Sequence, residues 1–352
     1  MSGWNLKLGE LKDQDVSEEK YWSLFNFVFS NNSKKRNTYK FGLIKAILDN
    51  LFNGVNTDKG IFITYYDLFA KFTENYWNLI VKYDLRQMRK DRKSEFSKIE
   101  VILKEVIQFD EILKNLEFQS INLKQKEIII KKVNIECKRC VLGALYEDFE
   151  GTLYSFVRKG QGLYLSYKAY EFMLKYKLEI EKLNYYAWAK FLEKINSDKS
   201  LVRVIDKLEL ATPKRKNMKI YREVLKEEFQ ECRCFYCGKK LSKSIHVDHV
   251  IPWSFIKDNK IWNLVLTCSS CNKEKTNKVP NKKYIFILKE RNKKLELFDN
   301  KVVKKDFKRY SENLLEQMWE YAKMGGIKEY QGMMDGKQNN QILKTPNELY
   351  IE

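Results

Sequence analysis

The sequence contains little histidine and proline and no long apolar run. Its 352 residues include 2 histidines, His246 and His249, so any chemistry that requires an imidazole is confined to one short segment. The 4 prolines all lie at or after Pro213, and a region without proline is compatible with long helices because proline interrupts them. No apolar run is long enough to span a bilayer, and no signal peptide is evident. We therefore expect a cytoplasmic protein that has no membrane partner.

Acidic residues are in the minority. Lys and Arg together number 66 and Asp and Glu 47, which gives a formal net charge of +19. Such a charge favours a polyanionic partner, because binding releases the counterions of the polyanion. Abundant lysine has an alternative origin in an AT-rich genome, so local clusters of charge carry more weight than the total. The 44% hydrophobic content is sufficient for a sizeable core, and the length suggests two or three domains.

The region of residues 1–211 shows the periodicity of amphipathic helices. Apolar residues recur at helical spacing within residues 41–51, 64–79, 99–106, 167–178 and 185–195. A short strand and turn are predicted at 151–162, where two helical lobes would meet near residue 150. No repeat of roughly 20 to 50 residues is evident. We interpret the apolar stripes as core-forming faces, with base stacking by their aromatic residues as a less favoured alternative.

Four of the 7 cysteines form two CxxC pairs. Cys234 and Cys237 are the first pair, Cys268 and Cys271 are the second, and 30 residues separate the pairs. This spacing is typical of a Zn²⁺ site in which four thiolates bind one ion in a tetrahedron. Such a site is structural, because four cysteines leave no position for a catalytic water. The alternative is redox or disulfide pairing, which the expected reducing compartment disfavours.

The residues between the two pairs predict two short strands and a helix. Residues 245–251 alternate with a period of two and end where Pro252 removes a backbone donor. Residues 263–267 form a second short apolar run, and Ser269 begins a stretch that is typical of a helix start. The second cysteine pair therefore joins the end of a strand to the start of a helix.

Three polar residues of this segment are candidates for function. Asp248 and His249 would face opposite sides of a regular strand, so their joint action requires a bend. Asn272 falls in the first turn of the predicted helix, where its side-chain oxygen could reach a cation near His249. The alternatives are that His249 is a hydrogen-bonded strand histidine and that Asn272 only caps the helix.

The run HVDHVIPWSFIKDNKIWNLVLTCSSCNKEK, residues 246–275, resembles the core of HNH nucleases, also called ββα-metal nucleases. The shared features are the DH dipeptide followed by two apolar residues and proline, a middle asparagine and a closing asparagine. The run is also similar to the HNH domain of RNA-guided CRISPR nucleases, which have no cysteines at these positions. Its closing position is Asn272 in place of histidine, which is a common variant. The resemblance says little about the helical region.

The resemblance implies a catalytic base and a catalytic metal. His249 would take a proton from water, because an imidazole with an ordinary pKa near ~6.5 is mostly neutral at pH 7. Asp248 and Asn272 would bind one Mg²⁺ or Mn²⁺ ion through hard oxygen ligands. His246 would be a further ligand of this ion or bind a water attached to it.

The resemblance also implies supporting roles for two residues. Asn263 would brace the loop that orients His249. Lys275 would contact the substrate phosphate, although it could equally be a solvated lysine in a lysine-rich chain.

Basic residues flank the segment on both sides. Before it lie Lys214, Arg215 and Lys216, and after it residues 279–310 contain 11 Lys or Arg against 4 acids. Two basic flanks are typical of a surface that follows a phosphate backbone. The candidate residues on the second flank are Lys282, Lys283, Arg291, Lys293 and Lys294. The alternative is an ordinary solvated surface.

The sequence thus predicts a mainly α protein with three parts. A large helical region, residues 1–211, would serve recognition, regulation or dimerisation. An HNH domain with a zinc knuckle and a basic extension would cover residues 212–325, and residues 326–352 would form a loosely ordered tail. The expected activity is Mg²⁺-dependent hydrolysis of DNA, with RNA as an alternative substrate, in bacterial restriction or anti-phage defence.

The sequence also allows two alternative functions and suggests a second copy of the chain as a partner. A homing or mobile-element nuclease is the first alternative, and a non-catalytic zinc-ribbon protein that binds nucleic acid is the second. Because a single HNH site cuts one strand, cleavage of a duplex suggests a homodimer.

Overall fold

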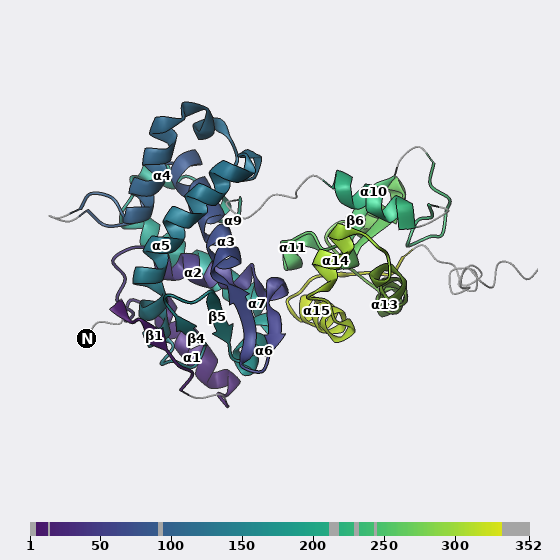
Figure 1. Ribbon diagram of the computed structural model, residues 1–352, viewed down its shortest axis with the longest axis horizontal. Helices are drawn as coiled ribbons and strands as arrows, with labels where there is room; N and C mark the ends of the chain where they lie inside the picture. Colours follow the sequence, from purple (N-terminus) through teal and green to yellow (C-terminus); the bar gives the residue numbers. More distant parts are fainter. Residues whose placement is uncertain are drawn as a thin grey trace, which may run out of the picture. The chain divides into compact units, whose positions relative to one another are not determined.

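The structure is a computed structural model in which residues 5–12, 15–90, 94–210, 218–228, 232–242 and 245–332 are described. The chain divides into two compact units, Met1–Lys214 and Arg215–Glu352, which Figure 1 colours from purple to teal and from green to yellow. The predictions for Lys214, Arg215 and Lys216 lie outside the described residues, as does most of the predicted tail. No helix in the described ranges combines the length and the apolar character that a bilayer crossing requires.

The N-terminal unit is mainly helical, as predicted. Its helices are α1 (Glu18–Phe29), α2 (Tyr39–Leu48), α3 (Tyr65–Trp77), α4 (Lys98–Phe109), α5 (Leu123–Asp148), α6 (Tyr167–Lys175), α7 (Lys177–Glu193), α8 (Asp198–Leu201) and α9 (Val204–Leu210). Thr64 caps α3 by accepting a hydrogen bond of 3.0 Å from the backbone N–H of Asp67. The amphipathic face of α3 is buried at Leu68, Phe69 and Phe72, because these residues share one side of the helix.

A five-stranded antiparallel sheet accompanies the helices. Its order is β1 (Leu8–Gly9), β4 (Tyr154–Val157), β5 (Gly162–Leu165), β3 (Gly60–Thr64) and β2 (Val55–Thr57). The sequence predicted a strand and turn only at 151–162, because strands of two to five residues are too short to show a clear period. A single hydrophobic core runs from Val16 to Leu208. The chain therefore does not divide into two lobes near residue 150.

The N-terminal unit contains two copies of one helix, hairpin and helix pattern. The first copy is α2, β2, β3 and α3, and the second is α5, β4, β5 and α6. The sequences that join the last strand to the last helix are alike: GIFITY at 60–65 and GLYLSY at 162–167. The repeat is not evident from the sequence alone, because α5 is much longer than α2 and the copies differ elsewhere.

The two copies meet with approximate two-fold symmetry. Phe62 of β3 pairs with Tyr164 of β5, which occupies the same place in the second copy, and their ring centroids are 4.8 Å apart. Tyr65, the first residue of α3, donates a hydrogen bond of 2.9 Å to the carbonyl of Val157, the last residue of β4. Tyr167, the first residue of α6, donates in the same way to the carbonyl of Thr57, the last residue of β2. Each copy therefore holds the end of the other's hairpin.

The C-terminal unit contains the predicted ββα arrangement. Its elements are α10 (Lys219–Glu228), β6 (His246–His249), α11 (Trp253–Ile256), β7 (Leu264–Thr267), α12 (Ser269–Lys275), β8 (Val279–Pro280), α13 (Lys282–Glu296), α14 (Lys301–Phe307), α15 (Glu312–Met324) and β9 (Glu329–Tyr330). β6 and β7 pair antiparallel, and α12 follows β7 directly. β9 pairs in parallel with β8, so this part of the predicted loose tail is a strand of the unit.

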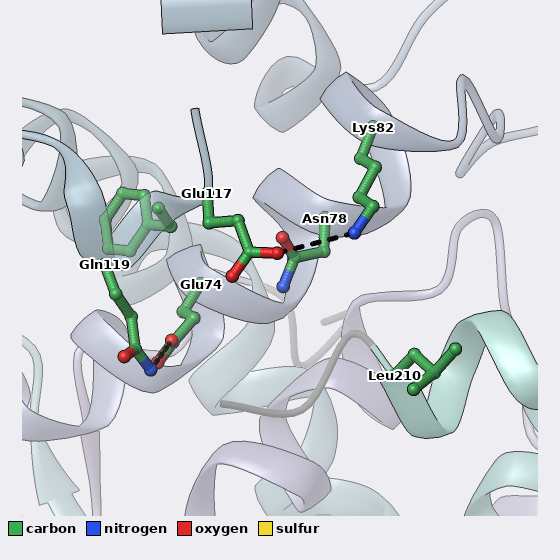
Figure 2. Close-up of a pocket in the computed structure, with 7 residues that line it drawn as sticks. Glu74, Asn78, Lys82, Glu117, Gln119 and Leu210 are labelled. Carbon is green, nitrogen blue, oxygen red and sulfur yellow. Dashed lines mark hydrogen bonds and ion pairs between the residues drawn. The ribbon is translucent and has the colours of Figure 1, made fainter. Parts of the chain in front are cut away.

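A small pocket lies on the surface of the N-terminal unit (Figure 2). Its cavity is about 10 Å³, which is room for a single water. Its polar side chains pair with one another, since Gln119 donates a hydrogen bond of 2.6 Å to Glu74, and Lys82 lies 3.6 Å from Glu117. These contacts are those of a surface network and leave no room for a substrate.

A buried group of charges joins α2 and α7 in the core. The side chain of Lys45 is 1% exposed, forms an ion pair with Asp49 on its own helix and lies 3.2 Å from Glu181 of α7. Burial alone lowers the pKa of Lys45, but the charges of Asp49 and Glu181 raise it above its ordinary value. The ammonium therefore stays charged and pairs with the buried carboxylates of Asp49 and Glu181.

We expect Lys45→Ala to lower the free energy of unfolding by about 3 to 5 kcal/mol, because it leaves two buried carboxylates without their cation. The matched control is Lys168→Ala, whose pair with Asp15 is exposed and should cost about 1 kcal/mol or less. Urea denaturation of both variants measures the difference. Equal losses in the two variants would contradict a stabilising role for the buried group.

Candidate active site and metal centre

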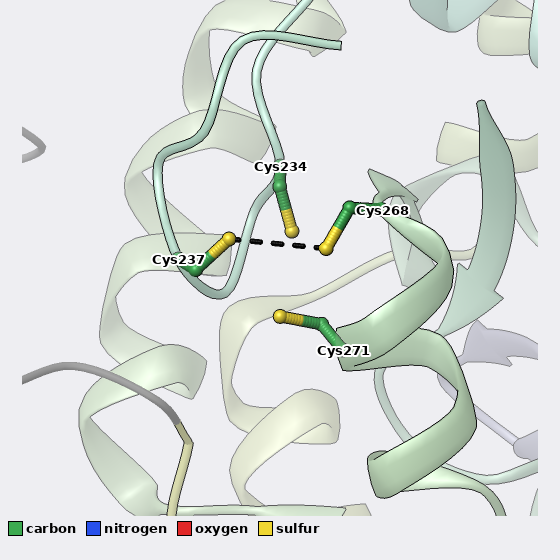
Figure 3. A group of neighbouring side chains, drawn as sticks. All are labelled: Cys234, Cys237, Cys268 and Cys271. Atoms are coloured by element: carbon green, nitrogen blue, oxygen red, sulfur yellow. Dashed lines mark hydrogen bonds between the residues drawn. The ribbon is translucent and has the colours of Figure 1, made fainter. Parts of the chain in front are cut away.

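The two CxxC pairs come together in one four-sulfur centre. The sulfur atoms of Cys234, Cys237, Cys268 and Cys271 all lie within 4.8 Å of one another, and Figure 3 shows them pointing toward a common point. The Sγ atoms of Cys237 and Cys268 are 3.9 Å apart. A tetrahedral zinc ion with Zn–S bonds of about 2.3 Å requires sulfur atoms about 3.8 Å apart, whereas a disulfide requires about 2.05 Å. The arrangement therefore fits a structural metal.

The local backbone brings each sulfur to this point. Gly238 closes the first knuckle with a φ of 71°, a left-handed conformation that glycine adopts without strain. Cys268 is the N-cap of α12, and Cys271 lies in the first turn of that helix. The backbone N–H of Phe235 donates a hydrogen bond of 2.9 Å to Leu266 in β7. The first knuckle is thus attached to the strand that leads into the second.

Electrostatics also favours a cation at this centre. Burial raises the pKa of Cys234 to about 11, and burial with the charges of Cys234 and Cys237 raises the pKa of Cys271 well above its ordinary value. Thiolates this close together repel one another. A divalent ion would offset this repulsion between thiolates, because it binds the deprotonated form of each cysteine.

Asp248 is held by two donors at the end of the β6 and β7 hairpin. Its side chain is 8% exposed, and its Oδ2 atom accepts a hydrogen bond of 2.9 Å from the hydroxyl of Tyr236. The same oxygen lies 3.0 Å from Nζ of Lys275. Burial, followed by the charge of Asp248, raises the pKa of Tyr236 well above its ordinary value. The phenol therefore stays protonated and donates.

His249 is the last residue of β6 and is 3% exposed. β6 stays regular through the pair of His249 with Leu264, and the chain bends immediately afterwards, at Val250 and Ile251. The bend therefore lies after the histidine and not between Asp248 and His249, whose side chains leave opposite faces of the strand. The Nε2 atom of His249 is 2.9 Å from Oδ1 of Asn259, and the ring centroid is 5.3 Å from that of Trp253. Asn259 was not predicted, because no motif marks it.

Asn263 clamps the loop that follows His249. Its side-chain Oδ1 accepts a hydrogen bond of 2.8 Å from the backbone N–H of Ile251, and its Nδ2 donates one of 2.9 Å to the carbonyl of the same residue. Its own carbonyl accepts a hydrogen bond of 2.9 Å from Val250. All three bonds fix the backbone just after the histidine, and Asn263 is itself fully buried.

The positions of the two remaining candidate ligands follow from their spacing on α12 and β6. Asn272 is half-buried in α12, one turn before Lys275, and residues at this spacing share a face of a helix. Lys275 reaches Asp248, so the three-residue spacing puts Asn272 near the face of α12 from which this contact is made. His246 is half-buried and precedes Asp248 by two positions in β6, which places both on one face of the strand.

Comparison with known proteins agrees with this geometry. Residues 234–281 match the family model described as HNH endonuclease. This segment is an HNH endonuclease domain. It is similar to the CRISPR-associated endonuclease Cas9 of Streptococcus mutans serotype c, with 41% identity over 64 residues, which are 17% of this chain and 5% of Cas9. The chain thus matches only a small part of that relative's length. No solved structure matches the chain.

Lys275 of the HNH domain does not have the position that its predicted role requires. Its side chain is 0% exposed, and Nζ donates a hydrogen bond of 2.6 Å to the carbonyl of His249 in addition to its contact with Asp248. An ammonium that is enclosed by the domain cannot contact a substrate phosphate. Lys275 is therefore an internal support of the active site.

The basic candidates on α13 divide into exposed and buried residues. Lys282, Lys293 and Lys294 are exposed and Lys283 is half-exposed, although Lys293 lies 2.7 Å from Glu290. Arg291 is 8% exposed, and its NH2 atom donates a hydrogen bond of 2.9 Å to the carbonyl of Leu264 in β7. The prediction that Arg291 binds nucleic acid is therefore wrong, because its guanidinium supports the hairpin from inside.

Arg291 faces a buried carboxylate of α10. The distance from NH1 of Arg291 to Oε2 of Glu228 is 3.9 Å, and both side chains are 8% exposed. Burial raises the pKa of Glu228 from 4.5 to about 7, although the charge of Arg291 opposes the shift. Between these two values the native state holds a proton that the unfolded state releases, so stability falls as the pH rises through this window.

We expect the free energy of unfolding to decline by up to about 3 kcal/mol between pH 4.5 and 7 through Glu228. Glu228→Gln should remove this contribution, because the amide does not titrate. The exposed neighbour provides the control, since Glu227→Gln should keep the wild-type slope. Denaturation at a series of pH values measures all three proteins, and parallel curves for wild type and Glu228→Gln would refute the assignment.

Removal of one sulfur ligand tests the metal centre. Cys268→Ser should lose the bound metal and unfold the HNH domain, because the binding energy of a structural zinc is part of the folding energy of so small a segment. Cys140→Ser, in α5 of the other unit, should keep both. Zinc content by mass spectrometry and hydrogen exchange of β6 and β7 are the measurements. Retention of one equivalent of zinc by Cys268→Ser would show that the ligand set is wrong.

Proposed function

We propose that the protein is a Mg²⁺- or Mn²⁺-dependent endonuclease that hydrolyses DNA phosphodiester bonds and carries a structural Zn²⁺. The observation that carries this proposal is the arrangement of Asp248, His249, Asn263 and Asn272 in one ββα unit that matches the HNH endonuclease family. The four-cysteine centre supports the zinc assignment, since its donors are soft thiolates in a closed tetrahedral set.

The proposed catalytic metal is held by oxygen ligands. Asp248 offers Oδ1, because both of its described contacts use Oδ2. Asn272 offers a neutral amide oxygen from the facing helix, and these two oxygen ligands suit a hard cation such as Mg²⁺, with water and phosphate completing the shell. His246 would add an imidazole ligand or bind a water attached to the ion. When bound, the ion would stabilise negative charge on the scissile phosphate and on the leaving oxygen.

His249 is the proposed general base. Oδ1 of Asn259 can only accept a hydrogen bond, so Nε2 of His249 carries the ring proton. The lone pair then resides on Nδ1, which can take a proton from the attacking water. Because the ring is 3% exposed and lies against Trp253, we propose that Trp253 moves when the substrate enters.

Charge supports a nucleic-acid substrate. The chain has a net charge of +19, and Lys282, Lys283 and Lys294 lie on a helix of the nuclease unit with their side chains exposed or half-exposed. Such residues favour a phosphate backbone through counterion release. We propose DNA as the substrate because the similar segment belongs to Cas9, and RNA remains the alternative that the cleavage assay distinguishes.

We propose a role in bacterial restriction or anti-phage defence, with a homodimer as the form that cuts a duplex. The N-terminal unit supplies a separate folded body for recognition or dimerisation. One HNH site cuts one strand, so two subunits are needed to cut both strands in one encounter. Sedimentation that shows a strict monomer with and without DNA would contradict the dimer.

Cleavage of supercoiled plasmid and of a single-stranded circle tests the activity. Wild-type protein should cut with Mg²⁺ and not with EDTA, and His249→Ala should be slower by about 10²- to 10⁴-fold, because it lacks the positioned base. Glu274→Gln, an exposed change on the same helix as Asn272, is the control and should cut like wild type. An RNA of the same length shows which nucleic acid is preferred.

Equal cleavage rates for wild type and His249→Ala would show that His249 is not the general base. Binding of DNA that needs neither Mg²⁺ nor His249, with no cleavage of any substrate, would instead favour the non-catalytic zinc-ribbon alternative.

A further inference from the structure

We propose that Tyr236, inside the first cysteine knuckle, is a positioning residue that orients Asp248 for the catalytic cation. The structural metal centre would then fix the geometry of the active site. This inference rests on the proposed nuclease function and goes beyond it, because it assigns a role in catalysis to a residue of the knuckle.

Tyr236 is fixed by its place in the chain and by its neighbours. It lies between Cys234 and Cys237 and is fully buried. Its ring meets those of Tyr284 and Tyr330 edge-on, with centroid distances of 5.2 Å and 5.5 Å. Its backbone carbonyl accepts a hydrogen bond of 3.1 Å from the hydroxyl of Tyr284. The phenol therefore has one orientation for as long as the knuckle is closed.

The hydroxyl of Tyr236 and the ammonium of Lys275 act on the same atom. Both contact Oδ2 of Asp248, at 2.9 Å and 3.0 Å. Two donors on one oxygen fix the rotation of the carboxylate, and they leave Oδ1 as the oxygen that would bind the cation. Hydrogen bonds to a metal ligand from such neighbours commonly change metal affinity by about 10- to 100-fold.

Each cysteine pair lies on a segment that carries one of the two donors to Asp248. Tyr236 belongs to the first knuckle, and Lys275 lies on α12, which begins at the N-cap Cys268 and contains Cys271. The four sulfurs hold the two donor-bearing segments together. The metal centre thus sets the distance between Tyr236 and Lys275, and with it the orientation of Asp248.

The test compares Tyr236→Phe with Tyr154→Phe in the full-length protein. Both variants delete one buried hydroxyl, but the hydroxyl of Tyr154 bonds to the backbone carbonyl of Leu142 in the N-terminal unit and not to Asp248. Zinc content is measured first. Binding of Mn²⁺ is then followed by electron paramagnetic resonance without DNA, with Asp248→Ala to identify the site, and the Mg²⁺ dependence of plasmid cleavage is measured last.

Tyr236→Phe should keep one equivalent of zinc, bind Mn²⁺ about tenfold more weakly and need correspondingly more Mg²⁺ for cleavage. Tyr154→Phe should match wild type in all three measurements. Wild-type Mn²⁺ affinity in Tyr236→Phe would overturn the positioning role, and so would loss of zinc from that variant, which would make Tyr236 a part of the metal centre alone. If wild type has no Mn²⁺ site that depends on Asp248 and cuts no substrate, the nuclease proposal itself fails.

Discussion

The four-sulfur centre is the constraint on which the nuclease unit depends. The β6 and β7 hairpin has four residues in each strand, and an isolated hairpin of this size is marginally stable. Cys268 follows β7 directly and caps α12, while the first knuckle is bonded to β7 through Phe235. One ion can therefore hold the hairpin, the helix and the knuckle in a fixed relation, which the side chains of the active site require.

The N-terminal unit obtains its stability in a different way. Its two copies of the helix, hairpin and helix pattern share one sheet and one core, so each copy completes the other. The hydrogen bonds that Tyr65 and Tyr167 each donate to the hairpin of the other copy are an example. A unit of this kind folds around apolar burial and the Lys45 ion pairs. The two units of the chain thus depend on separate physical interactions.

Burial determines whether a basic residue of this lysine-rich chain can contact nucleic acid or instead supports the fold. Lys275 and Arg291 were both predicted to contact nucleic acid, yet both are enclosed and donate to backbone carbonyls of the hairpin. A buried cation is retained where it satisfies carbonyls or carboxylates that have no water. The positive net charge therefore overstates the number of side chains that can meet a phosphate backbone.

The sequence by itself predicted the HNH segment, the clustering of the four cysteines and the ββα order, because CxxC spacing and the DH motif are local patterns whose chemistry tolerates few alternatives. It also predicted helices that correspond to α2, α3, α4, α6 and part of α7, since the helical period acts over a few residues, but it did not predict α5, the longest of the described helices. Only the tertiary structure decided which residues support the active site. Tyr236, Asn259 and the buried Lys275 act across 10 to 27 positions of sequence, and the sheet repeat joins strands about 100 positions apart. Contacts over such separations depend on packing, which no local pattern encodes.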